Sequence, residues 1–533
     1  MPASAPDAGA SPWWRAGVLY QIYPRSFADS TGNGHGDLRG VIEHLDHLSW
    51  LGVDGIWLSP INPSPDADWG YDVSDYRSVD PDFGDLDDLD RLVKEADARG
   101  IRVILDLVPN HTSDRHPWFV DARSGRSAAH RDWYVWADAK PDGSPPNNWR
   151  SSFGGPAWTF DEGTGQFYLH NFLPEQPDLN WWNEEVVQAF DDVLRFWFDR
   201  GIAGFRIDVA NGLVKDRDLR DNPATTDDDH PMVQAIGLRP VHNMNQAEVH
   251  DIYRRWRRIA DPYSAMFLGE TWVWDLETLM RFYGNGTDEL DLALNFPSIF
   301  AELGGGTREM VEAAESLLPG GAWPTWAGSN HDVGRFPTRW GDGEERRVRA
   351  ALVMLLTLRG TPLLYYGDEI GMPEVDVSRE RLRDPVGLRR WPEDPGRDRG
   401  RTPMHWTAEG GFTEPGVDPW LPMGDAASCN VADQRDDPNS LLHLCRDLIA
   451  VRRDRDDLHS GPYEGLEGPE GVWAWRRGTV TVVAMNHGDA PATLSVGPAR
   501  VLIGTDRHRD GERVEGILRL DPWEALVLEE RNT

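Results

Sequence analysis

The chain has few cysteines, few basic residues and no long apolar run. Only Cys429 and Cys445 occur in 533 residues, too few to cross-link a chain of this size, so an oxidising compartment is not required. No stretch approaches the roughly 20 apolar residues of a membrane-spanning helix. Residues 1–12 lack both the basic start and the apolar centre of a signal peptide. We therefore expect a cytoplasmic protein with no membrane partner.

Positive charge is also scarce. The chain has 54 Lys and Arg residues against 89 Asp and Glu residues, a formal net charge of -35 at pH 7. This excess repels the phosphates of nucleic acids, so no nucleic-acid partner is expected. The charge otherwise reports on solubility and does not identify a function.

Short apolar and β-branched runs alternate with amphipathic helical stretches along most of the chain. The predicted strands are residues 18–23, 55–59, 102–108, 204–208, 267–270, 292–296, 325–330 and 363–367. Helical periodicity is clearest at 86–99 and 184–200. Strands that alternate with helices are typical of a parallel sheet. Eight such units predict an α/β fold, a (β/α)8 or TIM barrel.

The chain is too long for one ordinary domain, and its rhythm changes twice. Residues 110–180 are rich in Trp, Gly, Pro and Asp and predict a subdomain inserted after the third strand. The short runs that predict a C-terminal antiparallel β domain are 472–476, 479–486, 492–496, 500–503 and 525–528. The expected units are a barrel of residues 13–109 and 181–457, an inserted subdomain of 110–180 and a β domain of 458–533.

Four predicted strands end in polar residues. These ends are residues 106–111, 204–208, 267–270 and 329–332. A parallel barrel gathers the carboxyl ends of its strands at one face, so we expect one pocket rather than four sites. The irregular residues 211–245 are predicted to be a loop at the same face.

The three carboxylates at these ends suit three chemical roles. Arg206 and Asp208 point to the same face of their strand, and the guanidinium favours an ionised Asp208, as a nucleophile requires. Glu270 emerges from apolar residues beside Trp272, where desolvation favours a protonated general acid. Residues 330–332 could form hydrogen bonds to adjacent hydroxyls of a sugar and so favour an oxocarbenium-like transition state. Taken alone, each motif also fits a structural ion pair or a capped turn.

Together, the four strand ends resemble those of glycoside hydrolase family 13, the α-amylase superfamily. Residues 13–27, 70–76, 176–180 and 401–406 look like the α-glucosidase and oligo-1,6-glucosidase branch of that family. The resemblance runs from about residue 13 into the C-terminal β domain. It implies the barrel fold and an oligosaccharide substrate, in a monomer or small homo-oligomer.

The resemblance also assigns roles to individual residues. Asp208 would be the nucleophile, Glu270 the acid/base and Asp332 the transition-state stabiliser. The implied glucose-binding residues are Asp68, Tyr71, His111, Phe153, Phe172, Arg206, His331 and Arg397. The expected reaction is exo-acting hydrolysis with retained configuration, without a catalytic cofactor. Retention requires the two catalytic carboxyl groups to lie about 5 to 5.5 Å apart.

One glycine-rich loop is a candidate cation site. Its candidate ligands are Asp29, Thr31, Asn33, His35 and Asp37. Hard cations prefer such oxygen-bearing side chains, and the resemblance implies a structural Ca²⁺ or Mg²⁺. A plain Asx/Gly turn is the alternative.

Three other functions remain open at this stage. Val209 follows the nucleophile and looks like the residue found in α-1,6-cleaving relatives, which favours an oligo-1,6-glucosidase. A transglucosylating or isomerising enzyme, such as a trehalose synthase or sucrose isomerase, would use the same three carboxylates. A noncatalytic sugar-binding barrel is disfavoured, because all three carboxylates are present.

Overall fold

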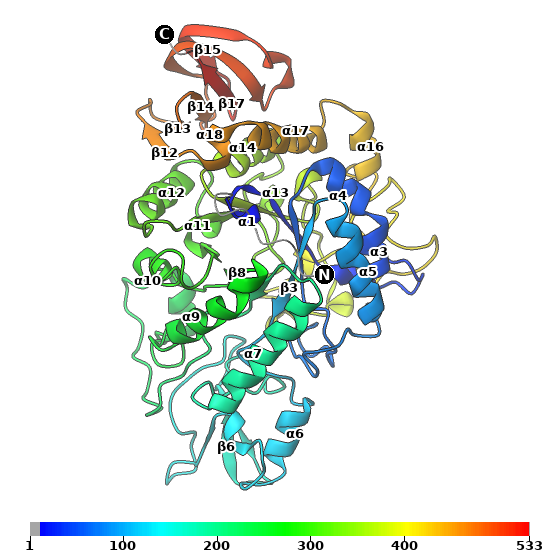
Figure 1. Ribbon diagram of the computed structural model, residues 1–533, viewed down its shortest axis with the longest axis vertical. Coiled ribbons are helices and arrows are strands. Elements are labelled where there is room, and N and C mark those ends of the chain that lie inside the picture. Colours follow the sequence, from blue (N-terminus) through cyan, green and yellow to red (C-terminus); the bar gives the residue numbers. More distant parts are fainter. Residues whose placement is uncertain (1–10, 532–533) are drawn as a thin grey trace.

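A computed structural model describes residues 11–531, and its central feature is a closed parallel sheet (Figure 1). The strands are β1 Leu19–Ile22, β2 Gly55–Leu58, β3 Arg102–Leu107, β7 Gly204–Ile207, β8 Met266–Gly269, β9 Leu292–Ala293, β10 Thr325–Ala327 and β11 Thr361–Tyr365. Their order is β10-β11-β1-β2-β3-β7-β8-β9. A parallel bridge between Leu294 and Thr325 joins the two edges. The predicted (β/α)8 barrel is confirmed.

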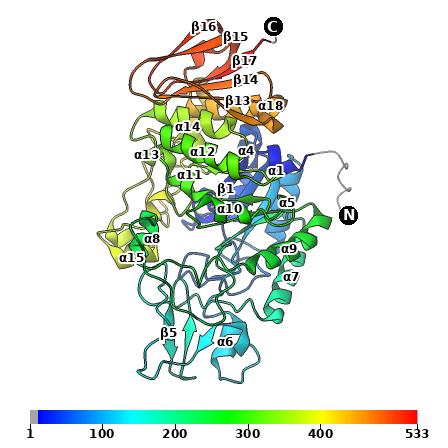
Figure 2. The same ribbon diagram turned by 90° about the vertical axis from the view of Figure 1, so that its left-hand side faces the viewer.

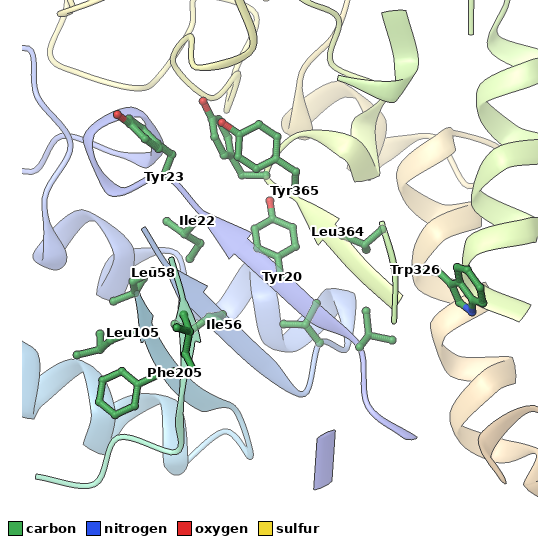
Figure 3. Packing of buried hydrophobic residues seen from close by; sticks show 14 of the residues in the cluster. Tyr20, Ile22, Tyr23, Ile56, Leu58, Leu105, Phe205, Trp326, Leu364 and Tyr365 are labelled. Atoms are coloured by element: carbon green, nitrogen blue, oxygen red, sulfur yellow. The ribbon is translucent and has the colours of Figure 1, made fainter. Parts of the chain in front are cut away.

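Burial on both faces explains why these segments form parallel strands. Every residue of β1, β2, β7, β8 and β11 is buried, as expected for a sheet covered on both sides. Figure 3 shows Tyr20, Ile56, Leu58, Leu105 and Phe205 projecting from neighbouring strands into one cluster of buried hydrophobic residues. The apolar runs therefore build a rigid frame, and the polar residues that follow them lie at its rim.

Helices surround the barrel and also lie in its loops. They are α1 Trp13–Ala16, α2 Pro24–Phe27, α3 Leu38–Glu43, α4 Leu45–Leu51, α5 Leu86–Asp97, α6 Pro117–Arg123, α7 Glu184–Asp199, α8 Pro231–Ile236, α9 Val249–Ala260, α10 Leu276–Arg281, α11 Phe296–Phe300, α12 Gly305–Leu317, α13 Phe336–Arg339, α14 Glu345–Thr357, α15 Pro385–Arg390, α16 Val431–Asp436, α17 Leu441–Asp454 and α18 Asp456–Ser460. Side-chain caps from Asp85 and Asn183 fix the starts of α5 and α7. Both helices were predicted within two residues at each end.

The segment after β3 contains a small sheet of its own. Its strands are β4 Trp136–Ala137, β5 Trp158–Asp161 and β6 Gln166–Leu169, in the order β4-β6-β5. Trp149, Trp158 and Phe167 contribute to a separate hydrophobic cluster under this sheet. The segment lies at the opposite end of the molecule from the C-terminal sheet (Figure 1). The sequence showed no sustained helical period here, so the short α6 was not predicted.

The C-terminal region is a six-stranded sheet with antiparallel pairing. Its strands are β12 Tyr463–Leu466, β13 Val472–Arg477, β14 Thr481–Asn486, β15 Ala492–Gly504, β16 Arg513–Leu520 and β17 Ala525–Glu530. Two predicted strands prove to be one, β15, with a register shift between Val496 and Ala499. β12 and β16 were missed because much of each is exposed, including Ile517 at 71%.

Both cysteines are free thiols: Cys445 is buried in α17, and Cys429 donates to the carbonyl of Ile370. Across residues 11–531, no helix has the length and apolar character needed to cross a bilayer.

Candidate active site

The polar strand ends meet around one cavity of about 730 Å³. Asp208 follows β7, Glu270 follows β8, and Asp332 lies in the loop after β10. All three carboxylates line this cavity. Asp68, Tyr71, His111, Phe153, Phe172 and Arg397 line it too. Arg206 and His331 are not part of the lining but bond directly to residues that are.

Arg206 is the centre of the carboxylate cluster. Its guanidinium is fully buried, with Nη1 2.7 Å from Asp208 Oδ1 and 2.9 Å from Asp106 Oδ1. Nη2 lies 2.9 Å from Glu270 Oε2. Asp106 was not among the predicted site residues, although a carboxylate within an apolar strand was a visible signal. One cation therefore joins three carboxylates from three neighbouring strands.

This arrangement changes the expected charge of the nucleophile candidate. Burial raises the pKa of Asp106 to about 7. Burial and the charge of Glu270 also raise the pKa of Asp208, against the lowering effect of Arg206. The sequence suggested that Arg206 alone keeps Asp208 ionised. Its guanidinium instead lies close to three carboxylates, so its effect on the pKa of Asp208 is shared among them. Asp106 and Asp208 therefore ionise less readily than a free aspartate.

Glu270 is more strongly hydrogen bonded than its apolar neighbours suggested. Its Oε2 accepts the backbone N–H of Val209 at 2.8 Å, and its Oε1 accepts the indole N–H of Trp272 at 2.8 Å. Val209 adopts a left-handed φ of 48°, an unfavourable conformation for a β-branched residue. These donors, with Arg206, fix the direction of the carboxyl group. The expectation that Glu270 is a protonated general acid stays a prediction.

Asp332 lies among positive charges. Arg397 Nη1 and Arg401 Nη2 each lie 3.1 Å from Oδ1, and His331 Nε2 lies 3.1 Å from Oδ2. Burial lowers the pKa of His331, so its ring is neutral near pH 7. Although burial alone would raise the pKa of Asp332, the neighbouring His331 and the guanidinium groups of Arg397 and Arg401 lower it below the usual range. Asp332 is therefore ionised.

A second group of predicted residues forms one wall of the cavity. Tyr71 Oη lies 2.5 Å from His331 Nε2 and donates to Asp106 Oδ2 at 3.0 Å. His111 Nε2 lies 2.8 Å from the carbonyl of Tyr71. Burial lowers the pKa of His111 to about 4, so this ring is also neutral. The wall presents neutral polar groups held in fixed positions.

A group built around Arg397 adjoins this wall, because Gln176 Nε2 lies within 3.3 Å of both Asp68 Oδ2 and the carbonyl of Tyr71. Its Nη2 lies 2.6 Å from Asp68 Oδ1 and 2.6 Å from Asp384 Oδ1. The guanidinium stacks over the ring of Phe153 at 5.1 Å. Phe153 in turn meets Phe172 edge to face at 5.6 Å. An ion pair and two aromatic rings thus lie along this side of the cavity.

Several contributing residues were not predicted. Asp384 orients Arg397, and Arg401 shares Asp332 with it. Gln176 donates to Asp68 Oδ2 at 3.3 Å. The Arg-rich stretch and the residues 176–180 were visible in the sequence, but nothing near Asp384 marked it. Arg399, by contrast, pairs elsewhere, with Asp376.

The loop predicted to hold a cation is closed by its own hydrogen bonds. The Asp29 carboxylate accepts the backbone N–H groups of Thr31, Gly32 and Gly34 at 2.9, 2.8 and 2.7 Å. The Thr31 hydroxyl also donates to Asp29, at 3.2 Å. These oxygens therefore face the loop itself.

The remaining candidate ligands are similarly engaged. Asn33 Oδ1 accepts the backbone N–H of His35, and Asp37 caps α3. The ring of His35 lies 2.9 Å from the guanidinium of Arg25, a neighbour that repels a second cation. Among residues 11–531, no three His, Cys, Asp or Glu side chains form a metal-binding group. The residues do not fit a cation cage in this arrangement, and the predicted Ca²⁺ or Mg²⁺ is not confirmed.

Comparison with known proteins identifies the family. A family model described as the catalytic domain of alpha amylase matches residues 21–461. The chain is 42% identical over 495 residues to a probable alpha-glucosidase of Rhizobium meliloti (strain 1021), covering 90% of this chain and 88% of that protein. It is 38% identical over 495 residues to an oligo-1,6-glucosidase of Heyndrickxia coagulans, covering 85% and 87%.

A solved structure extends the likeness to the whole fold. The crystal structure of an alpha-glucosyl transfer enzyme matches with a TM-score of 0.91 and 40% sequence identity, covering 98% of this chain and 100% of that one. The family match also spans most of the barrel strands that carry the carboxylates. The chain therefore belongs to the α-amylase family and is a glycoside hydrolase.

Proposed function

We propose that the protein is an exo-acting, retaining α-glucosidase that removes terminal non-reducing glucose from short oligosaccharides. The observation that carries the proposal is the shared guanidinium of Arg206, which holds Asp208 and Glu270 together in the cavity that also contains Asp332. The name of the Rhizobium meliloti relative supports the same activity. No cofactor takes part in the proposed chemistry.

In the first step, Asp208 attacks the anomeric carbon of the bound glucose. The bond from this carbon to the glycosidic oxygen breaks, and Glu270 gives its proton to that oxygen as the sugar leaves. Asp332, ionised between Arg397 and Arg401, stabilises the positive charge on the ring in the transition state.

In the second step, Glu270 acts as a base. It takes a proton from water, the hydroxyl attacks the same carbon, and Asp208 leaves as a carboxylate. Two displacements at one carbon restore the α configuration. A retaining mechanism requires about 5 to 5.5 Å between the two carboxyl groups, and attachment to one guanidinium supports such proximity.

The walls of the cavity favour attack at a chain end. The Asp68 to Arg397 ion pair and the ring of Phe153 lie on one side of the carboxylates. A long chain would have to pass these groups to bind along an open groove. We infer that the inner part of the cavity accepts a single terminal glucose, held by Asp68, Tyr71, His111, Arg206, His331 and Arg397.

Two alternatives within the family use the same three carboxylates. An oligo-1,6-glucosidase is favoured by Val209, which lines the cavity beside the nucleophile, and by the name of the Heyndrickxia coagulans relative. Glucosyl transfer is favoured by the name of the structural neighbour. Transfer differs only in that an alcohol, not water, accepts the glucosyl group. The cytoplasmic location and the monomeric or small oligomeric state remain predictions.

Proton NMR of the first product tests the proposal. Maltose and isomaltose are each supplied to the enzyme, and the anomer of released glucose is recorded before mutarotation. We expect α-glucose first, with loss of this signal in Asp208→Asn and no loss in the exposed control Asp142→Asn. Initial β-glucose, or no cleavage of either disaccharide, would contradict the proposal. The ratio of the two rates decides between α-1,4 and α-1,6 preference.

A further inference from the structure

The catalytic cavity continues outward between two short helices. α8 and α15 lie close together at one side of the molecule (Figure 2), and residues of both line the cavity. Its volume of about 730 Å³ lies in the range of ligand pockets, roughly 300 to 1,000 Å³. One glucose would fill only the inner part. The outer part must therefore receive the aglycone, the group attached to that glucose.

The α8 side of this outer part is apolar. Met232, Val233 and Ile236 project from α8 into the cavity lining, and Leu238 follows them. No residue of α8 is buried, and Met232 is 43% exposed. Apolar side chains left exposed beside a binding cavity favour an apolar partner.

Three asparagine side chains at the outer wall are already engaged in hydrogen bonds with other protein groups. Asn222 Nδ2 donates to Asn243 Oδ1 at 2.8 Å, and Asn243 Nδ2 donates to Asn171 Oδ1 at 2.9 Å. Asn222 Oδ1 accepts the backbone N–H of His242 at 3.0 Å. These amides already bond to one another, so they offer a second sugar few free hydrogen-bonding groups. On this part of the wall, the hydroxyls of a sugar aglycone would lose hydrogen bonds to water that the amides do not replace.

Arginine side chains form a basic part of the same lining. Arg150 and Arg389 both line the cavity and are exposed. Neither makes a side-chain hydrogen bond or ion pair with any residue in the described range 11–531, whereas Arg390 pairs with Asp394 at 3.3 Å. Unpaired cations at one cavity mouth are unexpected in a chain with a net charge of -35. They would complement a negative group on the aglycone.

We propose that the outer cavity selects α-glucosides whose aglycone combines an apolar body with a carboxylate or other anionic group. The apolar body lies against α8, and the anion faces Arg150 and Arg389. This inference rests on the proposed α-glucosidase function and names its preferred substrate class. On cleavage, Glu270 protonates the leaving oxygen, which becomes the neutral hydroxyl of an alcohol or phenol. The separate anionic group of the aglycone keeps its negative charge.

A matched pair of substrates tests the proposal. The α-glucosides of hydroxyphenylpropionate and of hydroxyphenylpropionamide have the same shape and the same leaving phenol, and only the former is charged. At low salt we expect kcat/KM to favour the carboxylate by roughly twofold to thirtyfold, the range for two exposed ion pairs. The preference should shrink as salt screens the charges. Equal values at low salt would overturn the proposal.

Variants locate the effect. Arg150→Gln together with Arg389→Gln should bring the carboxylate to amide ratio close to one, while the control Arg513→Gln, on β16, should preserve it. Met232→Gln should lower kcat/KM for both aryl glucosides relative to maltose. An unchanged ratio in the double variant would refute the role of the arginines.

Binding without turnover separates this inference from the proposed function. Calorimetry with free hydroxyphenylpropionate and its amide should show tighter binding of the acid by the native protein, and no difference in the double variant. If maltose is cleaved but the acid has no advantage, the inference fails alone. If the acid binds more tightly but no α-glucoside is cleaved, the proposed function fails instead.

Discussion

At the scale of single residues, the distribution of cations distinguishes the three carboxylates. Asp332 has two guanidinium neighbours, Arg397 and Arg401, whereas Asp208 and Glu270 share Arg206 with Asp106. Asp332 is therefore ionised, whereas burial raises the pKa of Asp106 and Asp208. The same cavity thus contains a carboxylate that is held ionised and carboxyl groups that bind a proton more readily.

Replacement of Arg206 should destabilise the protein. In Arg206→Leu, three buried carboxylates would face one another without a cation, and we expect the free energy of unfolding to fall by about 3 to 5 kcal/mol. Urea denaturation at neutral pH measures this change. Arg206→Lys, which keeps the charge, should lose less. A loss below about 1 kcal/mol in Arg206→Leu, typical of an exposed pair, would show that Arg206 does not hold the cluster together.

The sequence predicted these residues unevenly. The positions of Asp208, Glu270 and Asp332 followed from their places at strand ends, because the barrel brings those ends together. Asp384 could not be predicted, because it lies in a long loop and meets Arg397 only through the folded chain. The hydrogen bonds that Glu270 accepts from Val209 and Trp272 could not be predicted, because the sequence does not show that these two N–H groups turn toward it.

At the scale of elements, strands buried on both faces were predicted and exposed ones were not. The barrel strands are continuous apolar runs, because side chains on both faces of the sheet are buried in the fold. β16 exposes most of its residues and includes Gly516 with a φ of 83°, so its sequence gives little strand signal. The short helix α8 lies within residues 211–245, which were expected to be irregular. None of its residues is buried, so it lacks the periodic apolar face that core packing gives a helix.

The loop of residues 29–37 should be stable without a metal ion. Asp29 accepts three backbone N–H groups and the hydroxyls of Thr31 and Thr413. Asp29→Ala would leave these donors unpaired, and we expect a loss of about 1 to 3 kcal/mol in the free energy of unfolding. A chelator such as EDTA should leave the unfolding midpoint of the native protein unchanged. A clear fall with chelator, reversed by added Ca²⁺ or Mg²⁺, would restore the cation site.

At the scale of the whole molecule, buried carboxyl groups should make stability fall as pH rises. Burial raises the pKa of Asp72, Asp106 and Asp368 to about 7, from about 3.9 in the unfolded chain. Between these values the folded state binds more protons than the unfolded state, so the free energy of unfolding decreases with increasing pH. Arg220 lowers the pKa of Asp216 to about 2, so ionisation of Asp216 changes the free energy of unfolding only below about pH 4.

Urea unfolding at constant ionic strength measures this dependence. Histidines whose pKa is lowered by burial, such as His111 and His116, have the opposite effect between about pH 4 and pH 6.5, so the test compares two proteins that share them. Asp368→Asn cannot ionise at this position, and we expect its stability relative to the native protein to rise between about pH 5 and about pH 7.5. A difference between the two proteins that stays constant or falls over this range would contradict the raised pKa of Asp368.

The proposed mechanism requires Asp208 to form a covalent bond to glucose in a pocket shared with Glu270 and Asp332. A fluorinated α-glucosyl fluoride that slows the second displacement should trap this intermediate, and mass spectrometry of peptides should locate the label. We predict one glucosyl label on Asp208, gained by the native protein and absent from Asp208→Asn. A label on another carboxylate, or hydrolysis of the reagent with no covalent species and β-glucose as first product, would contradict the account.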